Sequence, residues 1–151
     1  MDWAFDITVK NRIIMASFLE SLSLQELNKV PTGFNNNIIW NIAHLVVTQQ
    51  LLTYNLSGLP MLISDEMVSK YRKGSKVEIK ATQEEVNQVK EMLFSTLERT
   101  RQDYKKGIFK NYKEYTVTTK SNLTNIEQAI EFNNFHEGIH LGYILAMKKS
   151  L

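Results

Sequence analysis

Residues 124–149 read TNIEQAIEFNNFHEGIHLGYILAMKK, and this stretch decides the fold. Apolar and histidine side chains recur in it at steps of three and four residues, the spacing of one helix face: Ala129, Phe132, His136, His140, Tyr143 and Met147. Thr124 and Glu127 have the spacing of an N-terminal capping box, and two lysines suit the negative C-terminal end. The stretch therefore predicts a long helix that ends near Lys149.

Three further segments show the same helical periodicity. The first predicted helix covers residues 3–22, the second runs from the asparagines at 35–37 to about Leu56, and the third extends from residue 82 to Gly107. The apolar stripe of the first helix consists of Trp3, Ile7, Ile14, Phe18 and Leu22, with Lys10, Arg12 and Glu20 outside it. Four long helices indicate a bundle.

The connections between these helices differ in length. Ser23 and Glu26 form a capping box that predicts one short helical turn after the first helix. Residues 60–81 hold a short helical patch at 65–71 and a basic stretch, which we interpret as a crossover, and residues 115–119 are treated as loop. We therefore expect an all-α fold, an antiparallel four-helix bundle with a longer crossover between helices two and three, in a single domain over 1–151.

Composition narrows the function classes. Of the 151 residues 43% are hydrophobic and 23% are charged, the net charge is only +2, and there is no cysteine. This balance is that of a soluble globular protein and gives no reason to expect a nucleic-acid or membrane partner. The lysine- and tyrosine-rich stretch 104–113 is expected to be a solvated helix end, and the absence of a leader pattern favours a cytoplasmic location.

All three histidines of the chain fall on predicted inner faces. His136 and His140 are one helical turn apart, so both imidazoles can reach one ion, and His44 lies on the inner stripe of the second helix beside Trp40. Without cysteine, histidines and carboxylates are the only plausible metal ligands. The alternative is that the three imidazoles bind no metal and only line a pocket, which would require hydrogen-bond partners for each.

The two histidine segments resemble a known family. Residues 40–45, WNIAHL, and residues 136–144, HEGIHLGYI, are similar in order and separation to the signature segments of the DinB-like superfamily, as are the crossover residues 70–75, KYRKGS. The resemblance implies a four-helix bundle in which His44, His136 and His140 bind one divalent ion. It also implies a homodimer, because members often pair through the bundle, and metal-dependent transfer of a low-molecular-weight thiol, because some members are such transferases.

The chemistry of three imidazole ligands is compatible with metal-dependent thiol transfer. Three imidazoles leave a coordination position open, and a bound divalent ion lowers the pKa of a coordinated thiol or water. We expect zinc or nickel, with iron or manganese as further candidates, and a small-molecule substrate. The competing hypothesis is a non-catalytic metal-binding or stress-related dimeric module. Side chains within a turn or two of the histidines are candidates for orienting them or lining a pocket: Asn37, Trp40, Asn41, Asn133, Glu137 and Tyr143.

Overall fold

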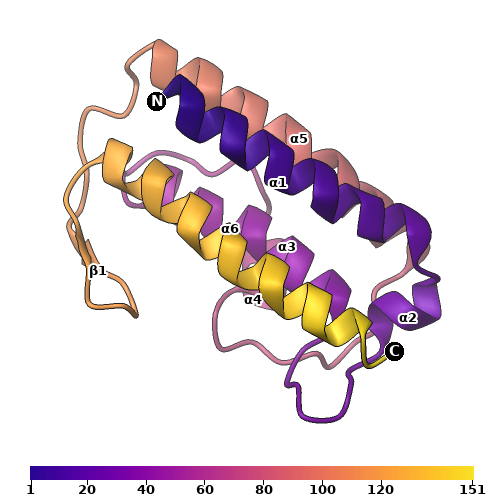
Figure 1. Ribbon diagram of the computed structural model, residues 1–151. Coiled ribbons are helices and arrows are strands. Elements are labelled where there is room, and N and C mark those ends of the chain that lie inside the picture. The colour runs from indigo at the N-terminus through magenta and orange to yellow at the C-terminus, as the bar shows by residue number, and fades with distance from the viewer.

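The computed structural model describes residues 1–151 and is mostly helical. Its helices and strands, in chain order, are α1 (Asp2–Ser21), α2 (Leu24–Asn28), α3 (Ile38–Gln50), the π-helix η1 (Leu51–Asn55), α4 (Asp65–Tyr71), α5 (Gln83–Lys105), β1 (Tyr115–Thr116), β2 (Asn122–Leu123) and α6 (Ile126–Lys148). The predicted all-α class is confirmed. The long helices α1, α3, α5 and α6 lie side by side (Figure 1).

Helix α1 packs against both α5 and α6. It is parallel to one of them and antiparallel to the other. Thr8 bonds Asn134 and Arg12 bonds Glu137, so residue numbers rise together and α1 is parallel to α6. Arg12 also bonds the Leu93 carbonyl, one turn from Thr96 on α5, and the N-terminus of α1 lies at the C-terminal end of α5 (Figure 1). Helices α1 and α5 are therefore antiparallel.

Helix α3 likewise contacts both α5 and α6. Gln49 bonds Thr100 and Tyr54 bonds Asp103, which makes α3 and α5 parallel. Asn41 contacts His140 and Met147, whereas His44 contacts His136, so α3 and α6 are antiparallel. Of the four packed pairs of long helices, only α1–α5 and α3–α6 are antiparallel, as expected for the bundle. The α3–α5 pair is parallel because residues 56–82 lead the chain back to the end of the molecule where α3 begins, and α5 starts there (Figure 1).

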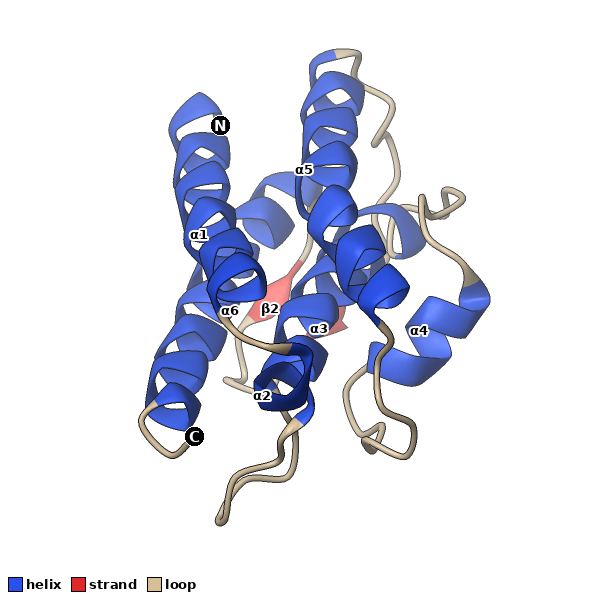
Figure 2. Ribbon diagram, turned by 90° about the vertical axis from the view of Figure 1, so that its right-hand side faces the viewer, coloured by secondary structure: helices blue, strands red, loops and turns tan.

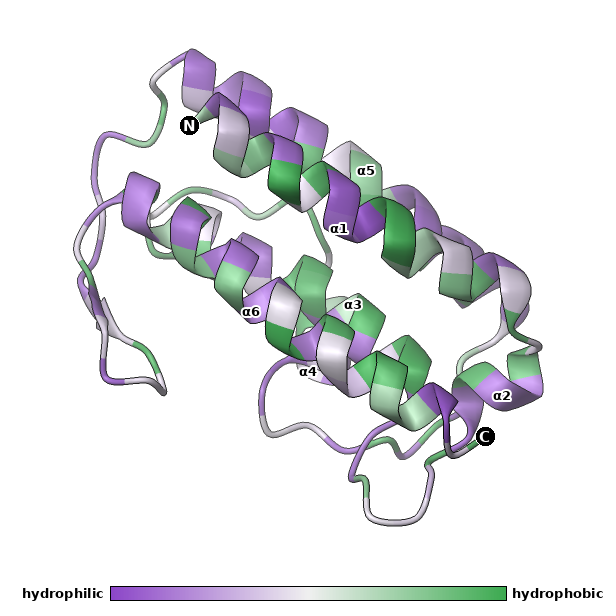
Figure 3. Ribbon diagram, in the orientation of Figure 1, coloured by the Kyte–Doolittle hydropathy of each residue, from purple (hydrophilic) through white to green (hydrophobic).

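The main hydrophobic core lies between α3 and the other long helices. Twelve of the thirteen α3 residues are buried, whereas α5 buries a narrower stripe at helical spacing. Figure 3 shows this contrast: α3 is mostly hydrophobic along its length and α5 is hydrophilic over much of its outer surface. Helix α3 is thus the central element, and a side chain projecting from it reaches the interior.

The buried face of α1 differs from the predicted stripe. Trp3 is 76% exposed and Ile14 is 42% exposed, whereas Arg12, which was expected outside the stripe, is completely buried. The buried residues of α1 are Ala4, Phe5, Thr8, Arg12, Met15, Ala16, Phe18 and Leu19. The prediction was wrong because it treated Arg12 as a solvent-facing charge, and the helix is rotated so that this guanidinium meets a buried carboxylate.

Side-chain caps mark the starts of most helices, and the cap of α6 differs from the predicted one. The Ser23–Glu26 capping box is present, and Thr82 accepts a hydrogen bond from the Glu85 amide at the start of α5. At α6 the cap is Asn125, whose side chain accepts from the Gln128 amide, and not the expected Thr124. The asparagine takes this role because the helix begins one residue later than the pattern suggested.

The two long connections both pack against the α3–α6 side of the molecule. The crossover contains α4 as predicted, and Figure 2 shows α4 outside the four long helices, beyond α5 and α3. The segment predicted as loop near 115–119 instead begins a small antiparallel hairpin, in which Tyr115 pairs with Leu123. No helix of the chain is long and apolar enough to cross a membrane.

Candidate metal centre

The three histidines meet between α3 and α6. His44 projects from the middle of α3, and His136 and His140 lie one turn apart on α6. The ring centroids are 4.5 Å apart for His136–His140, 4.8 Å for His44–His140 and 5.2 Å for His44–His136. One ring nitrogen from each lies within 4.8 Å of the other two, so the group could hold a metal ion.

Hydrogen bonds fix the orientation of two of the rings. Nδ1 of His44 lies 2.6 Å from the Tyr71 carbonyl oxygen, which can only accept, so this nitrogen carries the proton. Nδ1 of His140 lies 2.8 Å from Oδ1 of Asn41, whose amide nitrogen is already donating to the Asn37 carbonyl. Both rings therefore turn an unprotonated Nε2 toward the cluster, the tautomer that binds metal.

His136 completes the cluster with fewer partners. Its Nε2 lies 3.2 Å from Nε2 of His140, and its buried Nδ1 has no hydrogen-bond partner. Two nitrogens bound to one tetrahedral ion at about 2.0–2.1 Å would be about 3.3 Å apart, so the observed separation suits a shared ion. The His44 Nε2 also lies 3.2 Å from Thr48 Oγ1, a hydroxyl that can rotate away.

Burial keeps these imidazoles neutral. Desolvation, followed by the neighbouring histidines, lowers the pKa of His136 to about 3, and the same two causes lower the pKa of His140 to about 4. The pKa of His44 is lowered by desolvation, although its bond to the Tyr71 carbonyl acts the other way, and the charge of Lys73 lowers it further. All three are therefore unprotonated at neutral pH, as metal ligands must be.

The crossover holds His44 in place from the other side. The Trp40 ring stacks on the His44 ring with centroids 4.7 Å apart and planes 12° apart. Nε1 of Trp40 donates to Ser75 Oγ at 3.0 Å, and Ser75 in turn donates to the Lys70 carbonyl. Residues 70–75 thus supply a hydrogen-bond acceptor to His44 and a hydrogen-bond acceptor to the Trp40 ring that stacks on it.

A cavity of about 640 Å³ opens at the cluster. Its 21 lining residues include all three histidines, and the remainder come from α3 and Asn36 just before it, η1, the crossover, the hairpin and α6. Its apolar lining consists of Trp40, Leu51, Leu52, Leu56, Tyr115, Val117, Phe132, Phe135, Ile139 and Tyr143. A cavity of this size and polarity is suited to a small molecule.

Comparison with protein families finds a match that covers most of the chain. The model of the DinB superfamily matches residues 8–144, which include both histidine segments and the crossover. The chain belongs to the DinB superfamily. No curated protein matches it.

The other residues predicted around the site of this DinB-superfamily protein separate into two groups. Trp40, Asn41 and Tyr143 line the cavity, and Asn41 contacts a histidine directly. Asn37 does not line the cavity. It caps α3, where its side chain accepts from the Trp40 amide.

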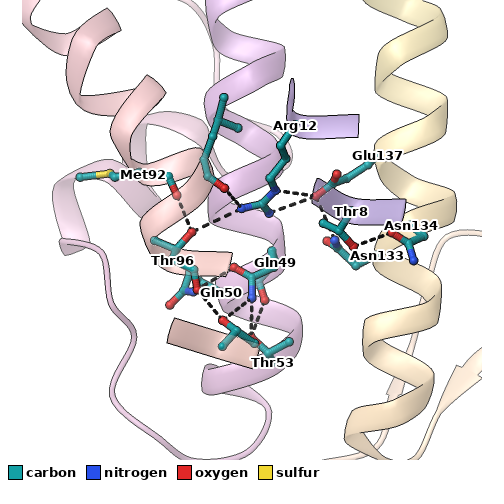
Figure 4. A network of polar contacts seen from close by, with 12 residues as sticks. Thr8, Arg12, Gln49, Gln50, Thr53, Met92, Thr96, Asn133, Asn134 and Glu137 are labelled. Atoms are coloured by element: carbon teal, nitrogen blue, oxygen red, sulfur yellow. Dashed lines mark hydrogen bonds and ion pairs between the residues drawn. The ribbon is translucent and has the colours of Figure 1, made fainter. Parts of the chain in front are cut away.

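Glu137 and Asn133 lie away from the cavity, on the side of α6 that faces α1 and α5. Glu137 is completely buried, and its Oε1 accepts from the Arg12 guanidinium at 3.0 and 3.1 Å and from Asn133 Nδ2 at 3.0 Å. Figure 4 shows Arg12 between Glu137 and the α5 residue Thr96. Neither Glu137 nor Asn133 lines the cavity, and Glu137 points about 100° around α6 from His136.

The sequence analysis missed three contributors to the site: Tyr71, Ser75 and Lys73. Tyr71 acts through its carbonyl group, which every residue type possesses, so no residue pattern could have identified it. Ser75 and Lys73 lie in the crossover residues 70–75, whose resemblance to a DinB-like segment did not indicate any contact with the histidine cluster. Their closeness to the histidines arises from the packing of that connection against α3.

Proposed function

We propose that this protein binds one divalent metal ion through His44, His136 and His140 and activates a low-molecular-weight thiol or a water for reaction with a small molecule. The observation that carries this proposal is the convergence of three imidazole nitrogens, within 4.8 Å of one another, on the lining of a cavity. Membership of the DinB superfamily supports it.

The residues present fit a metal ion. The facing Nε2 atoms of His136 and His140, 3.2 Å apart, need a proton or a cation between them. If His136 binds through Nε2, its Nδ1 carries the proton, as in the other two rings. An imidazole-only ligand set suits zinc or nickel best, with iron and manganese as further candidates.

The protein contributes orientation, neutral ligands and a sheltered cavity. Asn41 and the Tyr71 carbonyl fix the tautomers, and Trp40 holds the plane of the His44 ring. Three protein ligands leave a coordination position open, and an ion there lowers the pKa of a coordinated thiol or water so that it is nucleophilic near neutral pH. The apolar lining holds the reaction partner beside that position.

A dimeric module is the alternative, and one observation favours it. Helix α6 exposes large apolar side chains at steps of four residues: Phe135 (51%), Ile139 (48%) and Tyr143 (47%). Such a row is typical of a protein interface, and we infer a homodimer in solution. In the non-catalytic form of this proposal, the metal only stabilises the fold. Sedimentation velocity checks the dimer directly.

We also infer the finer description of the fold. Residues 1–151 form one domain, a four-helix bundle, because all four long helices share contacts and the last helix packs on the first. The proposed bundle has parallel α1–α6 and α3–α5 pairs, with the long crossover between its second and third long helices.

Elemental analysis of untagged protein purified without chelators tests the proposal. We expect close to one equivalent of a transition metal in the wild type, and none in a His136→Ala, His140→Ala double variant treated identically. Absence of metal from both proteins, even after incubation with zinc, nickel or manganese, would overturn the metal site.

Catalysis is then tested with the metal-loaded protein. Consumption of 3-mercaptopropionate by 1-chloro-2,4-dinitrobenzene should be faster with the wild type than with the double variant at equal concentration. A metal-loaded wild type that accelerates neither this reaction nor ester hydrolysis would support the non-catalytic module.

A further inference from the structure

The three rings of the cluster differ in which nitrogen carries the proton. All three are neutral at neutral pH, so each ring has one N–H donor and one nitrogen that accepts. In His44 and His140 the donor is Nδ1, because each of these atoms lies beside an accepting oxygen. The Nε2 atoms of both rings are therefore acceptors, and Thr48 Oγ1 lies 3.2 Å from that of His44.

His136 must carry its proton on the other nitrogen. Its Nε2 lies 3.2 Å from Nε2 of His140, and two acceptors cannot form a hydrogen bond. Because the His140 atom is an acceptor, the contact is a hydrogen bond only if His136 donates from Nε2. The Nδ1 of His136, which has no partner, is then the unprotonated nitrogen.

Metal binding requires the opposite arrangement at His136. Each ring must offer the lone pair of its Nε2 to the ion, and His44 and His140 already do so. Thr48 needs only to rotate its hydroxyl away from His44. His136 alone has to exchange a proton on Nε2 for a proton on Nδ1 before it can bind.

A protonated Nδ1 of His136 would need a hydrogen-bond acceptor, because the atom is buried. Asn133 lies one turn earlier on α6 and is 3% exposed. Its Nδ2 donates to Glu137 Oε1 at 3.0 Å, which fixes the orientation of the amide, and its Oδ1 has no partner (Figure 4). Residues three apart are neighbours on a helix surface, so this free oxygen belongs to the side chain next to His136.

Glu137 also has a buried oxygen without a partner, Oε2. Adjacent residues do not face each other on a helix, and the carboxylate is already turned to Arg12 of α1. Asn133 is therefore the better acceptor for His136.

We propose that His136 changes tautomer when the metal binds, its proton moving from Nε2 to Nδ1, and that Asn133 is the positioning residue whose Oδ1 accepts the new N–H. This inference rests on the proposed function. One proton leaves Nε2 for water and one from water reaches Nδ1, so the ring stays neutral. Asn133 would serve His136 as Asn41 serves His140, with its amide nitrogen on a neighbouring acceptor and its oxygen on the ring.

NMR of 15N-labelled protein identifies the tautomers directly. Long-range 1H–15N correlation spectra show which nitrogen of each ring is protonated, in chelator-treated protein and after addition of one equivalent of zinc, and single His→Gln variants assign the signals. In chelator-treated protein we expect the proton on Nδ1 of His44 and His140 and on Nε2 of His136. Zinc should move only the His136 proton, to Nδ1.

The role of Asn133 is tested in Asn133→Ala. This variant should bind zinc about 10-fold more weakly, and the His136 Nδ1 proton of its zinc-loaded form should exchange faster with solvent. The exchange of the His140 Nδ1 proton should not change, which separates a lost acceptor from a general loosening of the fold. Asn134→Ala is the matched control, since Asn134 lies on the same helix and bonds α1 instead.

The outcomes separate this inference from the proposed function. A His136 proton on Nδ1 in chelator-treated protein would overturn the change of tautomer and leave the metal site standing. Equal zinc affinity and equal proton exchange in Asn133→Ala and wild type would overturn the role of Asn133. If zinc alters none of the three rings, the metal site itself is wrong, and the inference about His136 fails with it.

Discussion

At the scale of single residues, the histidine cluster depends on side chains that touch the rings rather than on the rings alone. Asn41 is 1% exposed and lies on the same face of α3 as His44, where its amide can bond both the α3 backbone and His140. Such partners hold a ring at the angle that binding requires, so their loss weakens a site without removing a ligand.

Replacement of Asn41 tests this dependence. Asn41→Ala should weaken zinc binding about 10- to 100-fold, because His140 loses the acceptor that fixes its tautomer. Asn41→Asp keeps an acceptor and should retain most of the affinity. Competition with a chromophoric chelator measures both, with the exposed Asn87→Ala as control, and equal affinities for all variants would contradict the role of Asn41.

The depressed pKa values of the histidines predict a pH dependence of stability in metal-free protein. Above pH 6.5 the imidazoles are neutral in both the folded and the unfolded chain. As the pH falls below 6.5 the unfolded chain takes up protons, whereas His136 and His140, with pKa values of about 3 and 4, do not. The free energy of unfolding should therefore fall between pH 7 and pH 4.

Urea unfolding with a chelator present measures this effect. The loss should be on the order of 2 kcal/mol per histidine at pH 5, since each pKa unit corresponds to about 1.4 kcal/mol. A His136→Gln, His140→Gln variant lacks two of the titrating groups and should show a flatter profile. Identical profiles for the two proteins would exclude these histidines as the cause.

At the scale of the elements, α6 is positioned from both sides. One face presents the histidines to α3, and a neighbouring face presents Glu137 to Arg12 of α1, where both side chains are fully buried. Arg12 also donates to the Leu93 carbonyl at 2.7 Å, so this single side chain ties α1, α5 and α6 together (Figure 4). The pair sets the rotation of α6 about its axis.

Removing either partner of this pair should be costly. Arg12→Met or Glu137→Gln should lower the free energy of unfolding by about 3–5 kcal/mol, because each leaves a buried charge uncompensated. The double variant Arg12→Met, Glu137→Leu should recover part of the loss. Denaturant unfolding provides the values, and a double variant with a loss equal to the sum of the single losses would show that the two residues do not act as a pair.

The start of α6 provides a second test at this scale. Asn125→Ala should destabilise the protein by about 1 kcal/mol, because its side chain caps the Gln128 amide. Thr124→Ala should lower the stability by less, because the backbone amide of residue 124 still donates to the Gln128 side chain after the substitution. Thermal unfolding of both variants measures the difference, and the reverse order of effects would restore Thr124 as the cap.

At the scale of the whole molecule, a metal ion between α3 and α6 would join two helices that lie far apart in the sequence. The crossover and the hairpin also meet at this point, through Lys73 and Thr118. An ion bound only by the folded chain must therefore stabilise the entire fold.

Added zinc should raise the melting temperature of metal-free protein. At a free concentration 100 times the dissociation constant the gain is about 2.7 kcal/mol, which corresponds to roughly 5–10 °C for a chain of this size. His44→Ala should abolish the increase even though it removes only one ligand. A similar increase in that variant would indicate binding elsewhere.

The sequence by itself determined roughly where the long helices lie, and it predicted the three histidines that the fold brings together. Helical period, capping residues and the one-turn spacing of His136 and His140 are local properties, and each could be identified from a short stretch. His44 was the least certain of the three, because only its place on an apolar stripe connected it with the other two.

Tertiary structure alone decided the directions of the helices, the burial of Arg12 and Glu137, and the surroundings of the histidines. The parallel α3–α5 pair depends on the path of the crossover, and the bond from His44 reaches a carbonyl group that carries no residue signature. Arg12 appeared to be a surface charge because its partner lies 125 positions away. Local patterns encode helices, whereas the pairing of distant polar groups follows from packing, which no short stretch of sequence contains.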